Sequence, residues 1–187
     1  MALPGQPDPR TDEALVAAAD AGDASAFAAL YYRHRDWVVR LAYRVTGDAD
    51  LSLDVLQDVF AYLLARFPGF RLTAGLRTYL YPFVRHIAIE RQRKARRFTA
   101  ADGEFDRLPA PETRRTDAAD TDLAVVLATL PEGQREVLLL RFVDGMSLHA
   151  IAAALALPLG TVKSRLHNAL ATLREDARTR RFFLEGR

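Results

Sequence analysis

The sequence predicts an all-α protein of two small helical domains joined by a flexible linker, with a helix-turn-helix in the second domain. Three observations support this prediction. Apolar residues recur at helical spacing over residues 11–97 and 121–176, and no stretch alternates with the period of a strand. Residues 98–120 have no apolar period and are dominated by Pro, Asp, Thr and Ala, which favours a flexible linker. From Gln134 onward, two short helices, a tight turn and a helix with a cationic front follow one another.

The first domain begins after a proline-rich start, and residues 1–10 are expected to be disordered. Thr11 or Asp12 can cap a short helix that runs to about residue 20. A long helix then begins at Asp23 or Ser25 and ends at Gly47, because glycine readily adopts the left-handed conformation that closes a helix. Its Trp37 is expected in the core or at an interface of this domain.

A third helix is predicted from about Asp50 to Arg66. Its inward side chains are expected to be Leu53, Leu56, Phe60, Leu63 and Leu64. The breaker at residues 67–70 separates it from a fourth helix, which follows Thr73 and ends in the basic run of residues 91–97. Pro82 lacks a backbone donor, so it should kink this helix or mark its start.

The second domain begins with a helix that stops at Pro131. Its apolar residues are Leu123, Val126, Leu127 and Leu130. The next helix ends near Gly145, Ser147 can cap a short third helix, and Pro158 suits the first turn of the last helix, which runs to about Arg174. Residues 177–187 form a tail beyond it.

The last helix has two chemically different faces. At about 100° per residue, its apolar face comprises Val162, Leu166, Ala169, Leu170 and Leu173. The opposite face comprises Ser164, His167, Asn168 and Ala171, with Lys163 and Arg165 on the flanks. Asn, Arg, Lys and Ser are side chains that hydrogen-bond bases and phosphates, so the helix is predicted to read DNA.

The composition points to a polyanion partner and excludes several other classes. The formal net charge of the 187 residues is only +2, but residues 71–97 carry 8 basic side chains and 1 acidic one. There is no cysteine, hence no disulfide and no thiolate metal site. No apolar run reaches the roughly 18 residues of a membrane span, and the N-terminus does not resemble a secretory signal. We expect a cytoplasmic protein without membrane insertion.

Nothing in the sequence indicates an enzyme. The histidines, at positions 34, 86, 149 and 167, are scattered through separate predicted helices without metal-ligand spacing. There is neither a glycine-rich phosphate loop nor a nucleophile motif. We expect no catalytic residue, no metal and no cofactor.

Two groups of side chains in the first domain suit binding. Asp54 and Asp58 form an i, i+4 acidic pair on the outer face of the third helix, where basic residues of a partner can reach them. Three cations, Arg71, Arg77 and Arg85, are interleaved with the aromatic residues Phe67, Phe70, Tyr79 and Tyr81. Bases stack on aromatic rings while Arg pairs with phosphates, so this pattern favours single-stranded nucleic acid.

The chain resembles the extracytoplasmic-function family of sigma factors, the small specificity subunits of bacterial RNA polymerase. In the second domain the resemblance rests on Leu130–Glu132, Gln134–Phe142, Gly145, Ser147, Ile151–Ala152 and Gly160–His167. In the first domain it rests on Gly22–Asp23, Phe27, Leu30–Tyr31, Asp54, Gln57–Phe60, Leu76–Tyr81 and Arg85. Together these matches span about residues 11–175.

The resemblance implies roles for each part. Residues 11–97 would bind bacterial core RNA polymerase and the melted minus-ten strand, and residues 121–176 would bind the duplex minus-thirty-five element. An anti-sigma factor is a further implied partner. The implied polymerase contacts are Asp54, Gln57, Asp58 and Phe60. The implied minus-ten contacts are Arg71, Arg77, Tyr79, Tyr81, Arg85, His86, Arg93 and Arg96. The implied minus-thirty-five contacts are Thr161, Lys163, Ser164, Arg165, His167 and Asn168.

Some residues depart from the family pattern. Tyr79 stands where Trp is usual, and residues 82–86 replace the usual Arg-Ile-Ala-Arg-Asn. Leu64 replaces a common Trp and Leu53 a common Glu in the polymerase-binding helix. Two alternatives stay open: a stand-alone helix-turn-helix transcription regulator, since two-component response regulators share a similar C-terminal unit, and a sigma-like scaffold that has lost polymerase binding, which Leu53 and Leu64 suggest. The aromatic residues Phe60, Phe67 and Phe83 are expected in the core rather than in contact with a ligand, while Tyr79 and Tyr81 suit either role.

Overall fold

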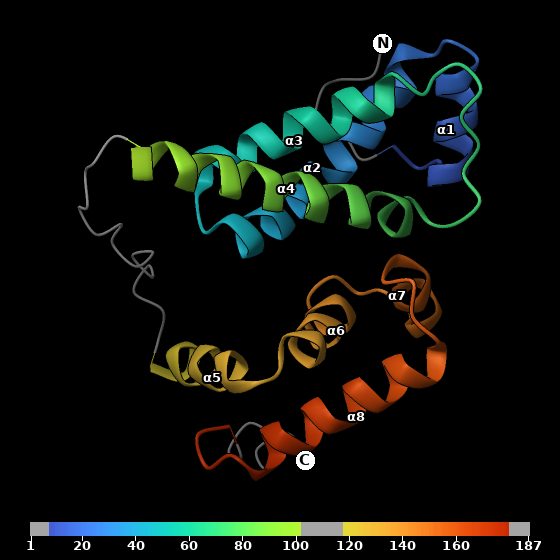
Figure 1. Ribbon diagram of the computed structural model, residues 1–187. Coiled ribbons are helices and arrows are strands. Elements are labelled where there is room, and N and C mark those ends of the chain that lie inside the picture. Colours follow the sequence, from blue (N-terminus) through green and yellow to red (C-terminus); the bar gives the residue numbers. More distant parts are fainter. Residues whose placement is uncertain (1–7, 102–117, 180–187) are drawn as a thin grey trace. The chain divides into compact units, whose positions relative to one another are not determined.

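The computed structural model describes residues 8–101 and 118–179, and within these ranges all regular structure is helical (Figure 1). The helices are α1 (Asp12–Asp20), α2 (Ala24–Thr46), α3 (Ala49–Leu64), α4 (Leu76–Ala101), α5 (Ala118–Thr129), α6 (Glu132–Phe142), α7 (Leu148–Ala154) and α8 (Leu159–Glu175). The chain divides into two units, one formed by α1–α4 and the other by α5–α8. The all-α prediction is confirmed for the described residues.

The central helix of the first unit is α2, which contacts α1, α3 and α4. Its ends are set by two residues that the sequence indicates. The carboxylate of Asp23 accepts hydrogen bonds from the backbone N–H groups of Ser25 and Ala26, which stabilises the first turn. Gly47 closes the helix with φ +69°, in the left-handed region. Trp37 is buried in the core at the middle of the helix.

The phase of α3 differs from the prediction. Leu53 and Leu64 are 49% and 54% exposed, so the expectation that they point inward was wrong. The buried side chains are Ser52, Val55, Leu56, Val59, Phe60 and Leu63. Ser52 can lie inside because its hydroxyl is hydrogen-bonded to the backbone oxygen of Asp48 and the hydroxyl of Thr46.

Two other expectations for the first unit need correction. Pro82 lies inside α4, well past its first residue, so it does not mark the start of the helix. The helix also continues past residue 97 to Ala101, and α5 begins at Ala118, so both ends of the predicted 98–120 linker are helical. Residues 102–117 lie outside the described residues.

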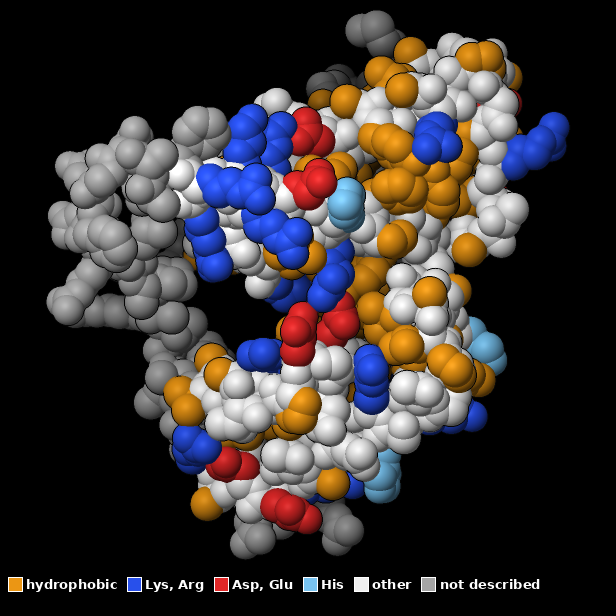
Figure 2. Space-filling model, in the orientation of Figure 1, with side chains coloured by type: hydrophobic (Ala, Val, Ile, Leu, Met, Phe, Trp, Pro, Cys, Tyr) orange, Lys and Arg blue, Asp and Glu red, His pale blue; other side chains and the backbone are white. Residues whose placement is uncertain are grey.

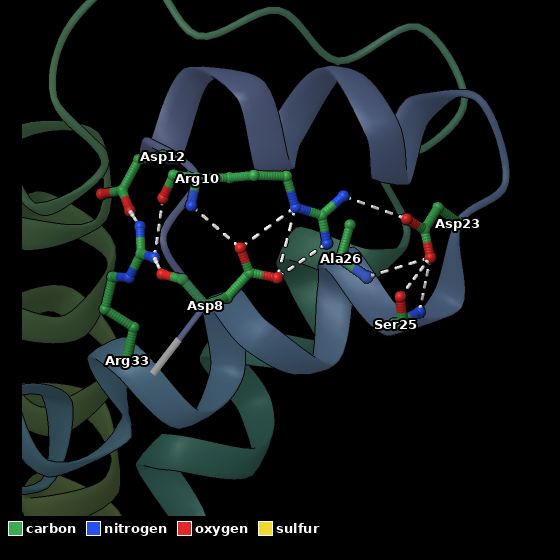
Figure 3. Close-up of polar contacts among 7 residues, drawn as sticks. All are labelled: Asp8, Arg10, Asp12, Asp23, Ser25, Ala26 and Arg33. Atoms are coloured by element: carbon green, nitrogen blue, oxygen red, sulfur yellow. Dashed lines mark hydrogen bonds and ion pairs between the residues drawn. The ribbon is translucent and has the colours of Figure 1, made fainter. Parts of the chain in front are cut away.

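The segment before α1 is held against α2, although residues 1–10 were predicted to be disordered (Figure 3). The guanidinium of Arg33 on α2 donates to the carboxylate of Asp12 and to the backbone oxygens of Asp8 and Arg10. Arg10 in turn pairs with Asp8 and reaches Asp23 at the cap of α2. These bonds order residues 8–10, while residues 1–7 lie outside the described part of the chain.

The same network changes the ionisation of its carboxylates. Hydrogen bonds from Arg10 lower the pKa of Asp8 to about 2. Burial opposes ionisation of Asp12, but hydrogen bonds from His34 and Arg33 outweigh it, and the pKa of Asp12 is lowered. The imidazole Nε2 of buried His34 lies 2.9 Å from Asp12 Oδ2.

The core of the second unit confirms the predicted apolar face of α8. Val126 of α5, Leu130 just after α5 and Leu138 of α6 pack with Ala169 and Leu173 of α8. Leu127, Leu166 and Leu170 border this cluster, and Val162 is fully buried. The side chain of Leu123 lies outside the described residues. Past α8, the Thr179 hydroxyl donates to the backbone oxygen of Leu173, while residues 180–187 are outside the described chain.

The turns around α7 use the residues that the sequence singles out. Gly145 adopts φ +68° after α6, and the Ser147 hydroxyl accepts a hydrogen bond from the Ala150 N–H to cap α7. Pro158 is the N-cap of α8, immediately before its first turn. Ala156 has φ +51°, a left-handed conformation that costs free energy for any residue with a Cβ atom.

Candidate nucleic-acid and partner interfaces

The front of α8 presents a polar, solvent-exposed surface. Lys163, Ser164, His167 and Asn168 are all exposed, and Thr161 is half-buried at the start of the helix. The Ser164 hydroxyl donates to the backbone oxygen of Thr161, which leaves its oxygen able to accept a further bond. Because Ala169 and Leu173 fix the opposite face in the core, the polar side chains must face away from it. This helix can therefore present hydrogen-bonding groups to the major groove.

Arg165 differs from its neighbours on α8, because its side chain lies back on the first turn of α6. A Cβ atom at Gly133 would be 2.8 Å from Arg165 Nη1 and 3.0 Å from its Cζ. A larger residue at position 133 would therefore require the Arg165 guanidinium to shift. The side chain of Arg165 is half-buried.

Cations gather along the second half of α4. Figure 2 shows a group of Lys and Arg side chains there, at the upper left of the view, with acidic side chains beside them. Arg93 and Arg96 are exposed, as are His86 and, in the loop before α4, Arg71. The imidazole Nε2 of His86 lies 3.5 Å from Glu90 Oε1 one turn further on. Arg85 is half-buried on the same helix.

Two of the predicted minus-ten residues are turned toward the protein. Tyr81 is only 3% exposed, so a direct contact between its ring and DNA bases was a wrong expectation. The reason is helix phase, since Tyr81 lies with Val84 and Ala88 on the buried side of α4. The Arg77 guanidinium lies 5.7 Å from the centre of the Trp37 ring, a cation–π contact that covers the core tryptophan.

An aromatic patch joins the end of α3, the following loop and the start of α4. The Tyr79 ring lies 4.9 Å from that of Phe70 and 5.4 Å from that of Phe83, which in turn lies 4.4 Å from the Tyr62 ring. The Arg66 guanidinium is 4.3 Å from the centre of the Tyr62 ring. Figure 2 shows hydrophobic side chains in this region, with a cation among them.

Sequence reasoning missed Tyr62 and Arg66. Their i, i+4 spacing on α3, just before the breaker, was the available signal. Burial raises the pKa of Tyr79, and a hydrogen bond with Tyr62 raises it further, so the Tyr79 phenol stays neutral at physiological pH.

The outer face of α3 carries the predicted polymerase contacts, with one exception. Gln57 is exposed and shares a helix face with Leu53 and Leu64, the two leucines that do not enter the core. Asp54 and Asp58 lie beside this stripe. Phe60 is 5% exposed and packs edge-on against Phe27 and Tyr31, so its expected contact with a partner is corrected to a core role.

The acidic pair on α3 already has a partner within the chain. Arg91 of α4 donates from Nε and Nη2 to Asp58 Oδ2, at 2.9 Å and 2.5 Å, and from Nη1 to Asp54 Oδ2 at 3.3 Å. The sequence placed the two aspartates correctly as neighbours on a helix surface. It did not indicate that a residue of the basic run would neutralise part of their charge.

Comparison with known proteins identifies the class first. Residues 30–98 match the model of sigma-70 region 2, and residues 126–175 match that of sigma-70 region 4. The first match covers most of α2–α4 and the second covers the helix-turn-helix formed by α7 and α8 with the helices before it. A chain with both regions is a sigma factor of the sigma-70 type.

Individual relatives narrow the assignment. The ECF RNA polymerase sigma factor SigL of Mycobacterium tuberculosis is 34% identical over 167 residues, which cover 86% of this chain and 94% of SigL. The chain belongs to the ECF family of RNA polymerase sigma factors.

Solved structures agree in fold. CnrH, solved with the cytosolic domain of CnrY, matches with a TM-score of 0.60 and 28% identity over 86% of this chain and 93% of CnrH. RpoE from Bartonella quintana, solved with the anti-sigma factor NepR, matches with a TM-score of 0.54 and 26% identity over 75% of this chain and 89% of RpoE. Within residues 8–101 and 118–179, none of the helices combines the length and apolarity needed to cross a bilayer.

Proposed function

We propose that the two units divide promoter recognition between them. Residues 11–97 bind core RNA polymerase and the melted minus-ten strand, residues 121–176 bind the duplex minus-thirty-five element, and residues 98–120 connect the two activities. Membership of the ECF family supports this division. The protein makes and breaks no covalent bond itself, because the polymerase supplies the chemistry in the cytoplasm where both act.

For the minus-thirty-five element, α8 is the reading helix. Lys163, Ser164, His167 and Asn168 contact bases or phosphates directly, and Thr161 contributes at the helix start. The proposal is supported by their common exposure on the face opposite the buried Ala169. Arg165 contacts the DNA once its guanidinium has moved away from α6, or from its present position beside α6.

For the minus-ten strand, the aromatic patch and the cations of α4 act together. Unpaired bases stack on Tyr79, while Arg71, Arg93 and Arg96 pair with phosphates and His86 adds a hydrogen-bonding ring. Arg77 and Arg85 contribute from half-buried positions at the edge. The interleaving of rings and cations supports this assignment, because stacking is worth about 1–3 kcal/mol per base and tolerates any sequence.

For core polymerase, the docking surface is the outer face of α3. Leu53 and Leu64 give it apolar contact area, and Gln57, Asp54 and Asp58 add polar and acidic groups. An exposed apolar stripe beside an acidic pair supports binding of a partner that is both apolar and basic. Leu64 keeps an apolar side chain where the family commonly has Trp, whereas Leu53 replaces a common Glu and makes the surface more apolar, so polymerase binding is altered in its detail.

An anti-sigma factor is a further proposed partner. RpoE was solved in complex with the anti-sigma factor NepR, and CnrH was solved in complex with the cytosolic domain of CnrY. This chain shares their fold. The partner would cover surfaces that the polymerase and DNA also need, so it would compete with both.

The observation that carries the proposal is the presence of both sigma regions in one chain, with exposed polar side chains on the faces proposed to bind. The test is pull-down of bacterial core polymerase followed by run-off transcription. We expect holoenzyme formation and initiation at a cognate promoter. Binding to duplex DNA without polymerase binding would favour the stand-alone regulator, and neither activity would favour the scaffold.

A further inference from the structure

Arg91 stands at the border between two binding faces of opposite charge. It belongs to the basic second half of α4, within one to two turns of Arg93 and Arg96. Its guanidinium is nevertheless turned to α3, where all three of its nitrogen atoms donate to Asp54 or Asp58. One residue of the DNA-facing helix is thereby bound to the surface proposed for polymerase docking.

The ion pair is incomplete in charge and open to solvent. One guanidinium faces two carboxylates, so a negative charge remains at the site. The side chains of Arg91, Asp54 and Asp58 are 35%, 50% and 38% exposed. In a partly exposed ion pair of this kind, the paired form is favoured over the separated form by only about two- to fivefold. A competing cation can therefore displace Arg91.

The surroundings provide room for that cation. A hollow of about 390 Å³ lies beside the pair, lined by Asp58, Ile87, Glu90, Arg91 and Lys94. Asp58 and Glu90 can receive the head of an incoming Arg or Lys, while Ile87 can pack against its aliphatic stem. Once Arg91 leaves, the two carboxylates of Asp58 and Glu90 outnumber the one remaining cation, Lys94, so the hollow then fits a basic side chain of a partner better than an acidic one.

We propose that Arg91 couples polymerase docking to DNA binding. In the free protein it neutralises part of the Asp54–Asp58 pair; when a basic side chain of core polymerase takes its place, Arg91 is released to bind a phosphate of the promoter strand. The inference rests on the proposed docking role of α3. A guanidinium binds phosphate as well as it binds carboxylate, so the exchange keeps its hydrogen bonds. Coupling of this kind is reciprocal, so DNA that captures Arg91 also favours polymerase binding.

The test uses the full-length protein without polymerase and a fluorescent single-stranded oligonucleotide. Asp54→Asn with Asp58→Asn releases Arg91, and we expect the affinity to rise about two- to fivefold. One additional phosphate contact should also steepen the dependence of log affinity on log salt by about 0.7. Since the loss of two acidic charges favours any polyanion, Glu13→Gln with Asp36→Asn is the matched control. These two exposed residues of α1 and α2 should give a smaller rise without the steeper slope.

Arg91→Gln, made in the wild type and in the Asp54→Asn, Asp58→Asn variant, completes a double-mutant cycle. It should weaken DNA binding clearly in the Asp54→Asn, Asp58→Asn background and hardly at all in the wild-type background. An equal loss in both backgrounds would show that Arg91 binds DNA regardless of the acidic pair. No loss in either would show that it never reaches DNA, and each of these results overturns the coupling. Thermal unfolding of each variant confirms that it is folded.

A separate measurement keeps this inference distinct from the docking proposal. Arg91→Gln uncovers the acidic pair and should tighten binding to core polymerase about two- to fivefold, whereas Arg97→Gln, with the same charge change on α4, should not. A loss of polymerase affinity in Arg91→Gln would contradict the exchange. If Asp58→Arg leaves polymerase binding intact, the docking face itself is wrong, whatever the DNA cycle shows.

Discussion

Replacing Pro82 by alanine tests how α4 accommodates a proline in its interior. The residue lies beyond the first turn of α4, where an N–H would donate to the backbone oxygen of Thr78. A proline inside a helix costs about 3 kcal/mol, through the lost hydrogen bond and the clash of its ring with the preceding turn. The proline ring also restricts the unfolded chain, and this effect stabilises the folded state by roughly 0.4–1 kcal/mol. Pro82 is exposed, so no core packing is lost on substitution.

We therefore expect Pro82→Ala to stabilise the first unit by about 2 kcal/mol, which corresponds to roughly 10 °C in Tm for a unit of this size. Trp37 is the single tryptophan of the chain and is buried in this unit, so its fluorescence reports the unfolding directly. Pro9→Ala is the matched control, because Pro9 is exposed and precedes the first helix. An unchanged or lowered midpoint for Pro82→Ala would refute the reasoning.

Three further predictions concern other parts of the chain. Ala156→Gly should stabilise the second unit by about 0.5–1 kcal/mol, because glycine adopts φ +51° without strain. Thermal unfolding followed by circular dichroism measures this effect. An unchanged melting temperature would show that Ala156 is not strained. Arg165→Ala should weaken binding to a minus-thirty-five duplex by about 1–3 kcal/mol if its guanidinium reads a base, and unchanged affinity would refute that role. The charge of Asp12, whose pKa is lowered, should stabilise the fold above about pH 4 and lose this effect as the pH falls through the folded-state pKa. The free energy of unfolding should therefore depend less on pH in the acid range for Asp12→Asn than for the wild type. Parallel curves for the two proteins would contradict a stabilising role for the Asp12 charge.

Helix ends were the part of the fold that the sequence predicted best. Asp23, Gly47 and Ser147 each act on backbone groups within a few residues, so their effect can be read locally. The apolar face of α8 was also predictable, because a single stripe of apolar residues satisfies the helical period.

The phase of α3 was harder to predict, since two overlapping stripes of leucine and valine are present. Packing against α2 and α4 decides between them, and it leaves Leu53 and Leu64 outside. The burial of Tyr81 has the same origin, because aromatic residues suit both a core and a stacking surface.

Contacts between residues far apart in the sequence could not be predicted at all. Arg91 meets Asp58, and Arg33 fixes residues 8–10, only after the helices have packed. Nothing in the local sequence distinguishes Arg91 from the other cations of α4. The residues proposed to contact promoter DNA and polymerase remain predictions, supported by their exposure and by the family.

Binding of core RNA polymerase to Asp58→Arg, compared with the wild type and with Asp36→Arg, tests the central claim most directly. Asp36 is an exposed acidic residue on α2, so its variant reproduces the change of charge away from the proposed face. We predict that the wild type and Asp36→Arg assemble a holoenzyme that initiates run-off transcription, while Asp58→Arg stays folded but fails to assemble. Equal assembly of all three proteins would contradict the account.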